Sequence, residues 1–272
     1  MTPVTNPYAG VRGPWLKAVL HAHSTNSDGS DAPAQVLREY ARLGYDVVAL
    51  TYHNTVPSAA ELQTDARVLT LPGCEYRSEP KNFGCPEIGL VGLTSMPPLD
   101  VPLEQGIAHV RASNAFAVYH HPNWHFDHWP TKPMFTHHAA HAVEVYNAVV
   151  EELQGPAEAS DKWDRLLSMG YRIWGVASDD AHHARQRGKA WTMIAATREP
   201  AAILAALKAG QFYASTGVAV TSVALCDGML SVTAPNAQRI RFIVERGAVR
   251  VDATGPTAGY TIRADDGYVR VE

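Results

Sequence analysis

The fold is decided by residues 15–23, which read WLKAVLHAH. The apolar run 15–20 predicts a strand, and His21 and His23 follow it directly. Because side chains alternate along an extended chain, both imidazoles lie on the same face. Residues 31–44 then have the apolar spacing of a helix that packs on one face. These residues therefore predict one β-strand and α-helix unit with two histidines at its strand end.

The same unit recurs along roughly the first 200 residues, as is typical of a parallel sheet with helical connections. Counting the first strand, the apolar runs predict seven strands, at 15–20, 46–50, 68–71, 88–93, 116–119, 142–145 and 173–177. Seven such units favour an α/β barrel. Short alternating strands replace the pattern after residue 217. We therefore expect a barrel domain at 1–217 and a small β-rich module at 218–272.

Composition limits the class of protein. The 272 residues are 46% hydrophobic and 18% charged, enough apolar material for a sizeable core. The net charge of −4 and the lack of a basic cluster argue against a nucleic-acid polymer as partner. Neither a signal peptide nor about 18 unbroken apolar residues is present, so we expect a cytoplasmic protein without a membrane span. The three cysteines form no Cys-x-x-Cys pair, which argues against thiolate zinc sites.

Metal-binding residue types follow the predicted strands. They are His21, His23, His53, Glu75, His120, His121, Glu144, Asn147, Asp180 and His182. One His-x-His pair equally fits a solvated edge strand, and His53 alone is uninformative. Six strand ends of a parallel barrel, however, meet at one mouth, and ionisable groups after a buried strand are costly without a partner or a metal. Imidazole with carboxylate suits Zn²⁺, Mn²⁺ or Fe²⁺, and so many ligands favour two ions or more with a bridging carboxylate.

Five motifs resemble the PHP (polymerase and histidinol phosphatase) family of metal-dependent phosphoesterases. They are His21-x-His23 with Ser27-Asp28-Gly29, Thr51-Tyr52-His53, Gly73-x-Glu75, His121-Pro122 and Ser178-Asp179-Asp180-Ala181-His182. The resemblance covers residues 17–183. Residues 201–217 also resemble the tail of a stand-alone branch that adds a small β module. The resemblance implies a distorted seven-stranded (β/α) barrel that holds two or three divalent ions.

The resemblance also implies the ligands. One ion takes His21, His23, Glu75 and Asp180; a second shares Glu75 and uses His121; a third takes Asp28, His53 and His182. Two positions depart from the family. Tyr52 replaces an Asp, so that either a supporting carboxylate is missing or Tyr52 acts on the substrate. Glu87 lies near the start of a strand where His is usual, so that it either ligates as a carboxylate or leaves a weakened site.

The remaining candidates are less specific. His183 either donates a proton to the leaving group or supports the site. Arg77, Arg187 and Lys189 are the nearest cations for a phosphate, and each also fits an ordinary surface charge. His120 is expected on the opposite strand face from His121, in packing or support. A polar and aromatic stretch is interpreted as a loop over the mouth, with His125, His128, His137, His138, His141, Trp124, Phe126 and Trp129.

The sequence therefore predicts a metal-dependent hydrolase, foremost a phosphoesterase. In this hypothesis a metal-bound hydroxide at a di- or trinuclear site attacks a small phosphorylated substrate, with Glu75 and Asp180 in the catalytic centre. One alternative keeps the metal site and cleaves carbamates or carboxylic esters, for which the aromatic loop suits an apolar leaving group. A further alternative is a metal-binding scaffold that has lost catalysis.

Overall fold

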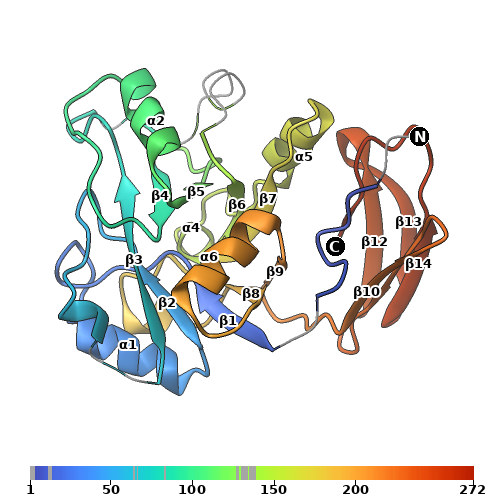
Figure 1. Cartoon of the computed structure of the whole chain (residues 1–272), viewed down its shortest axis with the longest axis horizontal. Coiled ribbons are helices and arrows are strands. Elements are labelled where there is room, and N and C mark those ends of the chain that lie inside the picture. The colour runs from blue at the N-terminus through green and yellow to red at the C-terminus, as the bar shows by residue number, and fades with distance from the viewer. Residues whose placement is uncertain are drawn as a thin grey trace.

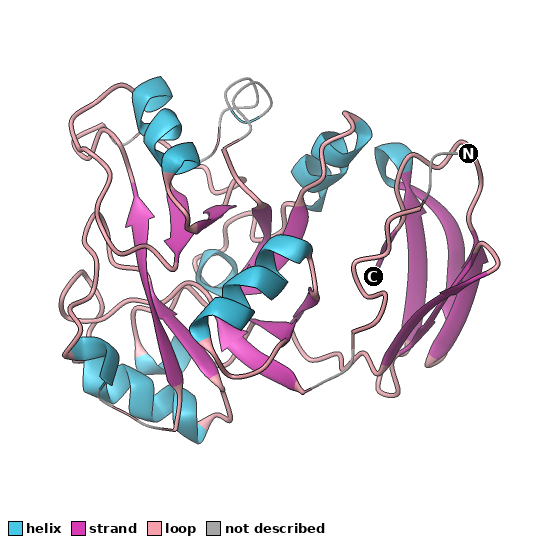
Figure 2. Ribbon diagram, in the orientation of Figure 1, coloured by secondary structure: helices cyan, strands magenta, loops and turns pink. Residues whose placement is uncertain are grey.

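The computed structural model describes residues 4–11, 14–63, 65, 67–82, 84–126, 129, 134 and 139–272. Figures 1 and 2 show a body of mixed strands and helices followed by a separate group of C-terminal strands. The helices of the first body are α1 (Pro33–Arg42), α2 (Leu103–Ala112), α4 (Ala148–Glu152), α5 (Ser160–Ser168) and α6 (Pro200–Ala209). Short 3₁₀ turns are η1 (Glu61–Gln63), η2 (Ala184–Gln186) and η3 (Glu245–Gly247). The fold is α/β, as predicted.

The described residues of this body form one sheet in the order β7-β6-β5-β4-β3-β2-β1-β8-β9. Its strands are β1 (Trp15–Val19), β2 (Val47–Leu50), β3 (Leu69–Tyr76), β4 (Ile88–Val91), β5 (Phe116–Tyr119), β6 (Ala142–Asn147), β7 (Trp174–Ser178), β8 (Trp191–Ala195) and β9 (Phe212–Ser215). The seven predicted strands all form. The sheet, however, has nine strands, because β8 and β9 continue it beyond β1. The predicted count of seven is therefore too low.

The sheet is not uniformly parallel. β4 runs antiparallel to both β3 and β5, and β8 runs antiparallel to both β1 and β9. The connection between β3 and β4 contains no helix among its described residues, and antiparallel neighbours need no helical crossover. Reversal of β4 brings its amino end to the edge where the parallel strands have their carboxyl ends.

The sheet nearly closes on itself where β7 approaches β1. Ala22 and Ala181, which follow these two strands, form a parallel bridge. The backbone N–H of Asp180 donates to the carbonyl of His21 at 3.1 Å, and that of His23 donates to the carbonyl of Ala181 at 3.2 Å. The segments that carry four of the predicted ligands are thus hydrogen-bonded to each other.

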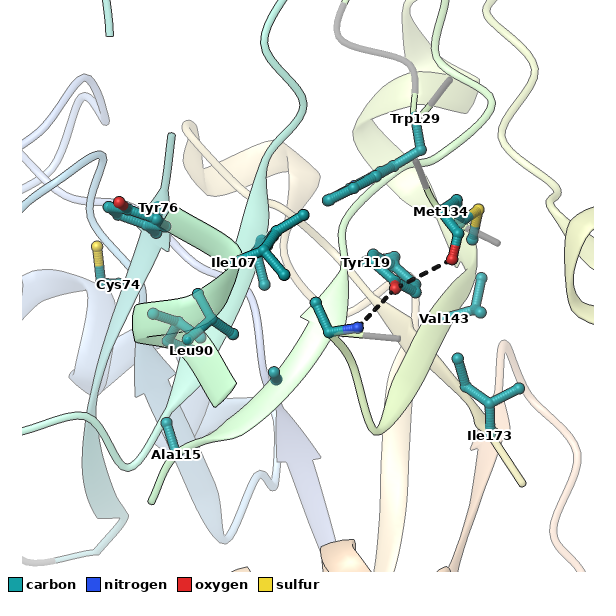
Figure 3. Close-up of a cluster of buried hydrophobic side chains, with 14 of the residues drawn as sticks. Cys74, Tyr76, Leu90, Ile107, Ala115, Tyr119, Trp129, Met134, Val143 and Ile173 are labelled. Atoms are coloured by element: carbon teal, nitrogen blue, oxygen red, sulfur yellow. Dashed lines mark hydrogen bonds between the residues drawn. The ribbon is translucent and has the colours of Figure 1, made fainter. Parts of the chain in front are cut away.

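Apolar side chains packed against the strands hold the sheet in place. Helix α1 packs Val36, Leu37 and Tyr40 among side chains of β1 and β2. Figure 3 shows the layer between β3–β5 and α2, where the Tyr119 hydroxyl accepts from the N–H of Ala139 and donates to the carbonyl of Met134. Buried apolar contact of this kind is the main source of stability, and it fixes the strand ends that bear the polar residues.

The C-terminal strands form two further sheets, defined here as the C-terminal sheets. They contain β10 (Ser222–Cys226), β11 (Met229–Thr233), β12 (Arg239–Val244), β13 (Ala248–Thr254), β14 (Thr257–Thr261) and β15 (Arg270–Val271), in the orders β10-β11-β14 and β13-β12-β15. Phe242 and Tyr260 lie in the apolar layer between them. Helix α5 lies against these sheets (Figure 1), and its Asp164 binds Arg270 at 2.6 and 2.7 Å.

No helix in the described part of the chain is both long and apolar enough to span a bilayer.

Candidate metal centre

Imidazoles and carboxylates from distant segments meet at the edge of the sheet where the parallel strands end. His21 and His23 follow β1, Glu75 lies in β3, and Asp180 follows β7. Glu87 immediately precedes β4, so the reversed direction of that strand brings it to the same edge. The sequence predicted this convergence from parallel strands alone. The antiparallel β4 accounts for the placement of Glu87.

The innermost group joins four predicted ligands, His21, His23, Glu75 and Asp180, which are all buried. Nε2 of His21 lies 3.1 Å from Oε1 of Glu75 and 3.1 Å from Oδ1 of Asp180. Nε2 of His23 lies 3.3 Å from Oε2 of Glu75 and 3.2 Å from the same Asp180 oxygen. Ligand atoms that share one ion at about 2.1 Å lie roughly 3–3.5 Å apart. The spacing fits a shared cation.

The ring orientation of His21 supports a cation at this place. Its Nδ1 lies 3.2 Å from the carboxylate of Glu144 and therefore carries the proton. A histidine that binds a metal ion carries no proton on the ligating nitrogen, and Nε2 of His21 is directed at carboxylate oxygens of Glu75 and Asp180. Among the described residues, Nε2 of His21, Nε2 of His23 and Oδ1 of Asp180 are buried without a hydrogen-bond partner. Buried polar atoms without partners are costly, and a divalent ion would satisfy all three.

A second group contains His21, Glu75, His121 and His120, the last of which was expected to point away. Nδ1 of His120 lies 2.8 Å from Oε1 of Glu75, and Nε2 of His121 lies 3.1 Å from the same oxygen. The prediction for His120 assumed strand alternation through both histidines. The strand ends at Tyr119, and His121 has a φ of 21°. The backbone thus leaves the extended conformation, and both rings turn inward.

The third group is the most open one. Asp28, with a side chain 52% exposed, lies 3.2 Å from Nε2 of His53 and 3.3 Å from Nε2 of His182. Its other oxygen lies 3.4 Å from Nδ1 of His23. Nδ1 of His182 donates to the carbonyl of Asp180 at 2.8 Å, which leaves its Nε2 for the group. This side of the centre faces solvent.

Glu87 belongs to a further group with His53 and Glu75. Its Oε1 lies 3.3 Å from Nδ1 of His53, and Nη2 of Arg77 lies 2.9 Å from the same oxygen. Glu87, which lies where the resembled family usually has His, is thus part of the centre. It also forms a buried ion pair with Arg77, a predicted phosphate-binding residue.

Glu75 is a member of three of these four groups. Oε1 faces His21, His120 and His121, whereas Oε2 faces His23 and His53 at 3.3 Å each. Burial alone would raise the pKa of Glu75, but the charges of His21 and His53 outweigh it and hold that pKa well below its usual range. A carboxylate that offers one oxygen to each neighbouring group has the geometry of a bridge between ions.

The histidine charges depend on the same carboxylates. Burial alone would lower the pKa of His23, but the nearby carboxylates of Asp180, Asp28 and Glu75 raise it to about 10. Hydrogen bonding to Glu75 likewise overcomes burial and raises the pKa of His121 to about 9. For His120, burial and the nearby charge of His21 keep the pKa below its usual value.

Glu144 and Asn147 hold the ligands from behind. The Glu144 carboxylate lies 3.2 Å from Nδ1 of His21 and accepts from the backbone N–H of His121 at 2.7 Å. The Asn147 amide donates to Glu144 at 2.9 Å and to Asp180 at 3.1 Å. Both residues had a signal in the sequence, because they lie in a strand whose neighbours end in ligands. Their orienting role depends on contacts with distant segments and was missed.

Several predicted site residues lie outside the groups. The Tyr52 hydroxyl donates to Glu61 at 3.1 Å, and its ring packs in the apolar layer beside α1. Arg187 is buried on Asp31 at 2.8 Å. His183 directly precedes η2 and is exposed, and Lys189 is exposed and donates its backbone N–H to Asp179 at 2.7 Å. The structure therefore brings none of these four side chains into the described metal-binding groups.

Some residues of the aromatic stretch lie beside the metal-binding groups, and others lie away from them. The Trp124 ring meets that of His121 edge-on with centroids 5.2 Å apart, and Phe126 is exposed next to it. Trp129 is buried and donates to the carbonyl of Glu87 at 2.8 Å. His141 packs on Phe116 away from the groups, and His125 is exposed. His128, His137 and His138 lie outside the described residues.

Comparison with known proteins supports the resemblance. Residues 166–212 match the model of the PHP-associated family. A two-domain protein from Bacteroides vulgatus ATCC 8482, described as containing a predicted PHP-like metal-dependent phosphoesterase, superposes with a TM-score of 0.56 and 18% identity, covering 96% of this chain and 89% of that one. PsfC from Pseudomonas syringae PB-5123 gives a TM-score of 0.53 with 13% identity, covering 75% of this chain and 92% of that one. No curated protein matches the sequence.

The chain therefore has the fold of a PHP-like protein and carries a PHP-associated segment. Its buried histidine and carboxylate groups are able to bind metal ions.

Proposed function

We propose that the protein is a metal-dependent hydrolase that cleaves small phosphoesters. The observation that carries the proposal is the set of partnerless buried atoms, Nε2 of His21, Nε2 of His23 and Oδ1 of Asp180, that face one another. These donors fit Zn²⁺, Mn²⁺ or Fe²⁺. The PHP-like fold and the PHP-associated segment support the same class of activity.

Bound divalent ions would supply charge neutralisation and a water of lowered pKa. The residues of the chain prepare the place for them. Glu75 separates two groups with its two oxygens, and Glu144 fixes the ring of His21. Asp28, His53 and His182 form the solvent-facing side, through which a small substrate would enter. We propose two or three ions in these groups.

A carbamate or carboxylic ester is the second candidate substrate, and a specific observation favours it. Two of the three predicted phosphate-binding cations are buried on carboxylates, Arg77 on Glu87 and Arg187 on Asp31. Their charges are balanced inside the protein. The exposed Lys189 is the remaining predicted cation. The edge of the Trp124 ring beside His121 adds an apolar wall that suits an uncharged substrate.

One panel separates these functions. Protein loaded with Mn²⁺ or Zn²⁺ is assayed on nitrophenyl phosphate, nucleotides, sugar phosphates, nitrophenyl acetate and naphthyl carbamate, with inorganic phosphate as inhibitor. Phosphoester cleavage that phosphate inhibits and that Asp180→Ala abolishes supports the proposal. Cleavage of only the acetate or the carbamate supports the second candidate. Tight metal binding without turnover on any substrate contradicts both and leaves a metal-binding scaffold.

A further inference from the structure

The ring of His120 occupies space that the neighbouring strand leaves open. Gly89 lies in β4, opposite Val118 of β5. A Cβ atom at position 89 would lie 1.9 Å from Nε2 of His120 and 2.5 Å from its Cε1. Any residue with a side chain at position 89 would therefore displace this ring. Glycine is the one residue that admits His120 to the centre.

Three imidazole nitrogens converge on one oxygen beside this glycine. Nδ1 of His120 lies 2.8 Å from Oε1 of Glu75, and Nε2 of both His21 and His121 lies 3.1 Å from that oxygen. A carboxylate oxygen has two lone pairs, so at most two of the three rings can donate a hydrogen bond to it. Hydrogen bonds alone therefore do not account for the convergence of all three rings, whereas a cation among the four atoms does.

The His120 ring is held rigidly in this place. It is 1% exposed and stacks on His21 with centroids 3.6 Å apart and planes 18° from parallel. Its backbone N–H donates to the carbonyl of Glu87 at 3.4 Å. Stacking on His21 and the backbone hydrogen bond keep the ring nitrogen directed at Glu75, as a metal ligand requires.

We propose that His120 binds a metal ion through Nδ1, together with His21, Glu75 and His121, and that Gly89 is the residue that permits this ligand. The inference rests on the metal centre of the proposed function. His120 follows β5, and alternation of side chains along the strand would have directed it away from the centre.

The test uses metal binding and needs no substrate. Metal-free protein is titrated with Co²⁺, whose visible spectrum reports the ligands, and Zn²⁺ affinity is measured by competition with a chromogenic chelator. His120→Asn retains an N–H near the position of Nδ1 and can still donate to Glu75, but it is a poor ligand. We expect at least about a tenfold loss of affinity for one metal equivalent and a changed Co²⁺ spectrum.

Position 89 provides the matched variants. Gly89→Ala should reproduce the loss of His120→Asn, because its Cβ displaces the ring. The double variant His120→Ala with Gly89→His should regain affinity, since it directs an imidazole from β4 into the same space. Gly259→Ala is the control, a glycine of β14 whose added Cβ would have its nearest neighbour at 3.6 Å.

Wild-type affinity and spectrum in both His120→Asn and Gly89→Ala would overturn the inference and leave the proposed function intact. Metal binding without hydrolysis of any ester would overturn the proposed function and leave the inference. Thermal unfolding checks that each variant folds. A crystal structure of the Zn²⁺-loaded wild type decides independently of folding: about 2.1 Å between Zn²⁺ and Nδ1 of His120 supports the inference, and an ion not bonded to that atom overturns it.

Discussion

Replacing Glu144 by Gln should weaken metal binding although Glu144 is not itself among the proposed ligands. The fully buried carboxylate accepts the N–H of His121 at 2.7 Å and the Asn147 amide at 2.9 Å on one oxygen, and its other oxygen lies 3.2 Å from Nδ1 of His21. An amide oxygen can keep the first two bonds. Its NH₂ group then faces Nδ1 of His21, so that the ring must carry its proton on Nε2.

A proton on Nε2 removes the lone pair that His21 directs at Glu75 and Asp180. Loss of such a supporting partner typically costs 10–100-fold in metal affinity, which corresponds to about 1.4–2.7 kcal/mol. We expect this loss for Glu144→Gln in Zn²⁺ competition titrations. Nitrogen NMR of labelled histidine in Zn²⁺-loaded protein should show the Nδ1–H form of His21 in the wild type and the Nε2–H form in the variant.

Glu152→Gln is the matched control, because Glu152 lies at the end of α4 and bonds Arg185 instead of an imidazole. Its affinity for Zn²⁺ should equal that of the wild type. Wild-type affinity in Glu144→Gln, or a His21 proton that stays on Nδ1, would refute the reasoning.

Three further predictions concern the ion pair of Asp164 with Arg270 and the histidines of the metal centre. Asp164→Ala should lower the free energy of unfolding by about 3 kcal/mol in urea titrations, because it leaves the largely buried Arg270 without its bidentate partner. The exposed ion pair of Arg239 with Asp252 is the control. An equally large loss of stability in Arg239→Ala would contradict this prediction. Zn²⁺ binding at pH 8 should release protons, since His23 and His121 have pKa values of about 10 and 9 without metal, so that calorimetric heats should vary with the buffer and affinity should rise with pH. In metal-free protein these raised pKa values add stability that is complete below about pH 6.5 and lost as pH rises through about 9 to 10. The unfolding temperature should therefore fall over that range, and a flat profile would contradict the raised pKa values of His23 and His121.

The positions of seven of the nine described strands of the large sheet could be predicted from the sequence, whereas the reversed direction of β4 could not. Apolar runs such as 88–93 mark a buried strand whichever way it runs. The direction of β4 follows from its pairing with β3 and β5. The segment before it has no helical pattern, and this was the available signal that no parallel crossover precedes β4. β8 was missed because its alternating burial is that of a strand with one open face.

The residues of the candidate site could be predicted one by one where a sequence motif marked them. The prediction failed where the position of a side chain depended on tertiary contacts. His120 was directed away by an alternation that ends one residue earlier, at Tyr119. Arg187 appeared close to the site along the chain, yet its charge is balanced by Asp31, 156 residues distant. Pairings between such distant residues leave no local pattern in a sequence. The same is true of Glu144, whose role depends on His21.

In the proposed centre, Glu75 bridges metal ions bound by the surrounding histidines and aspartates. Anomalous diffraction at the metal edge, from crystals of the protein grown with Mn²⁺ or Zn²⁺, tests this bridge. We expect two or three peaks, with each oxygen of Glu75 about 2.0–2.2 Å from a different ion. Crystals that show no peak within bonding distance of Glu75 in the presence of excess metal would contradict it.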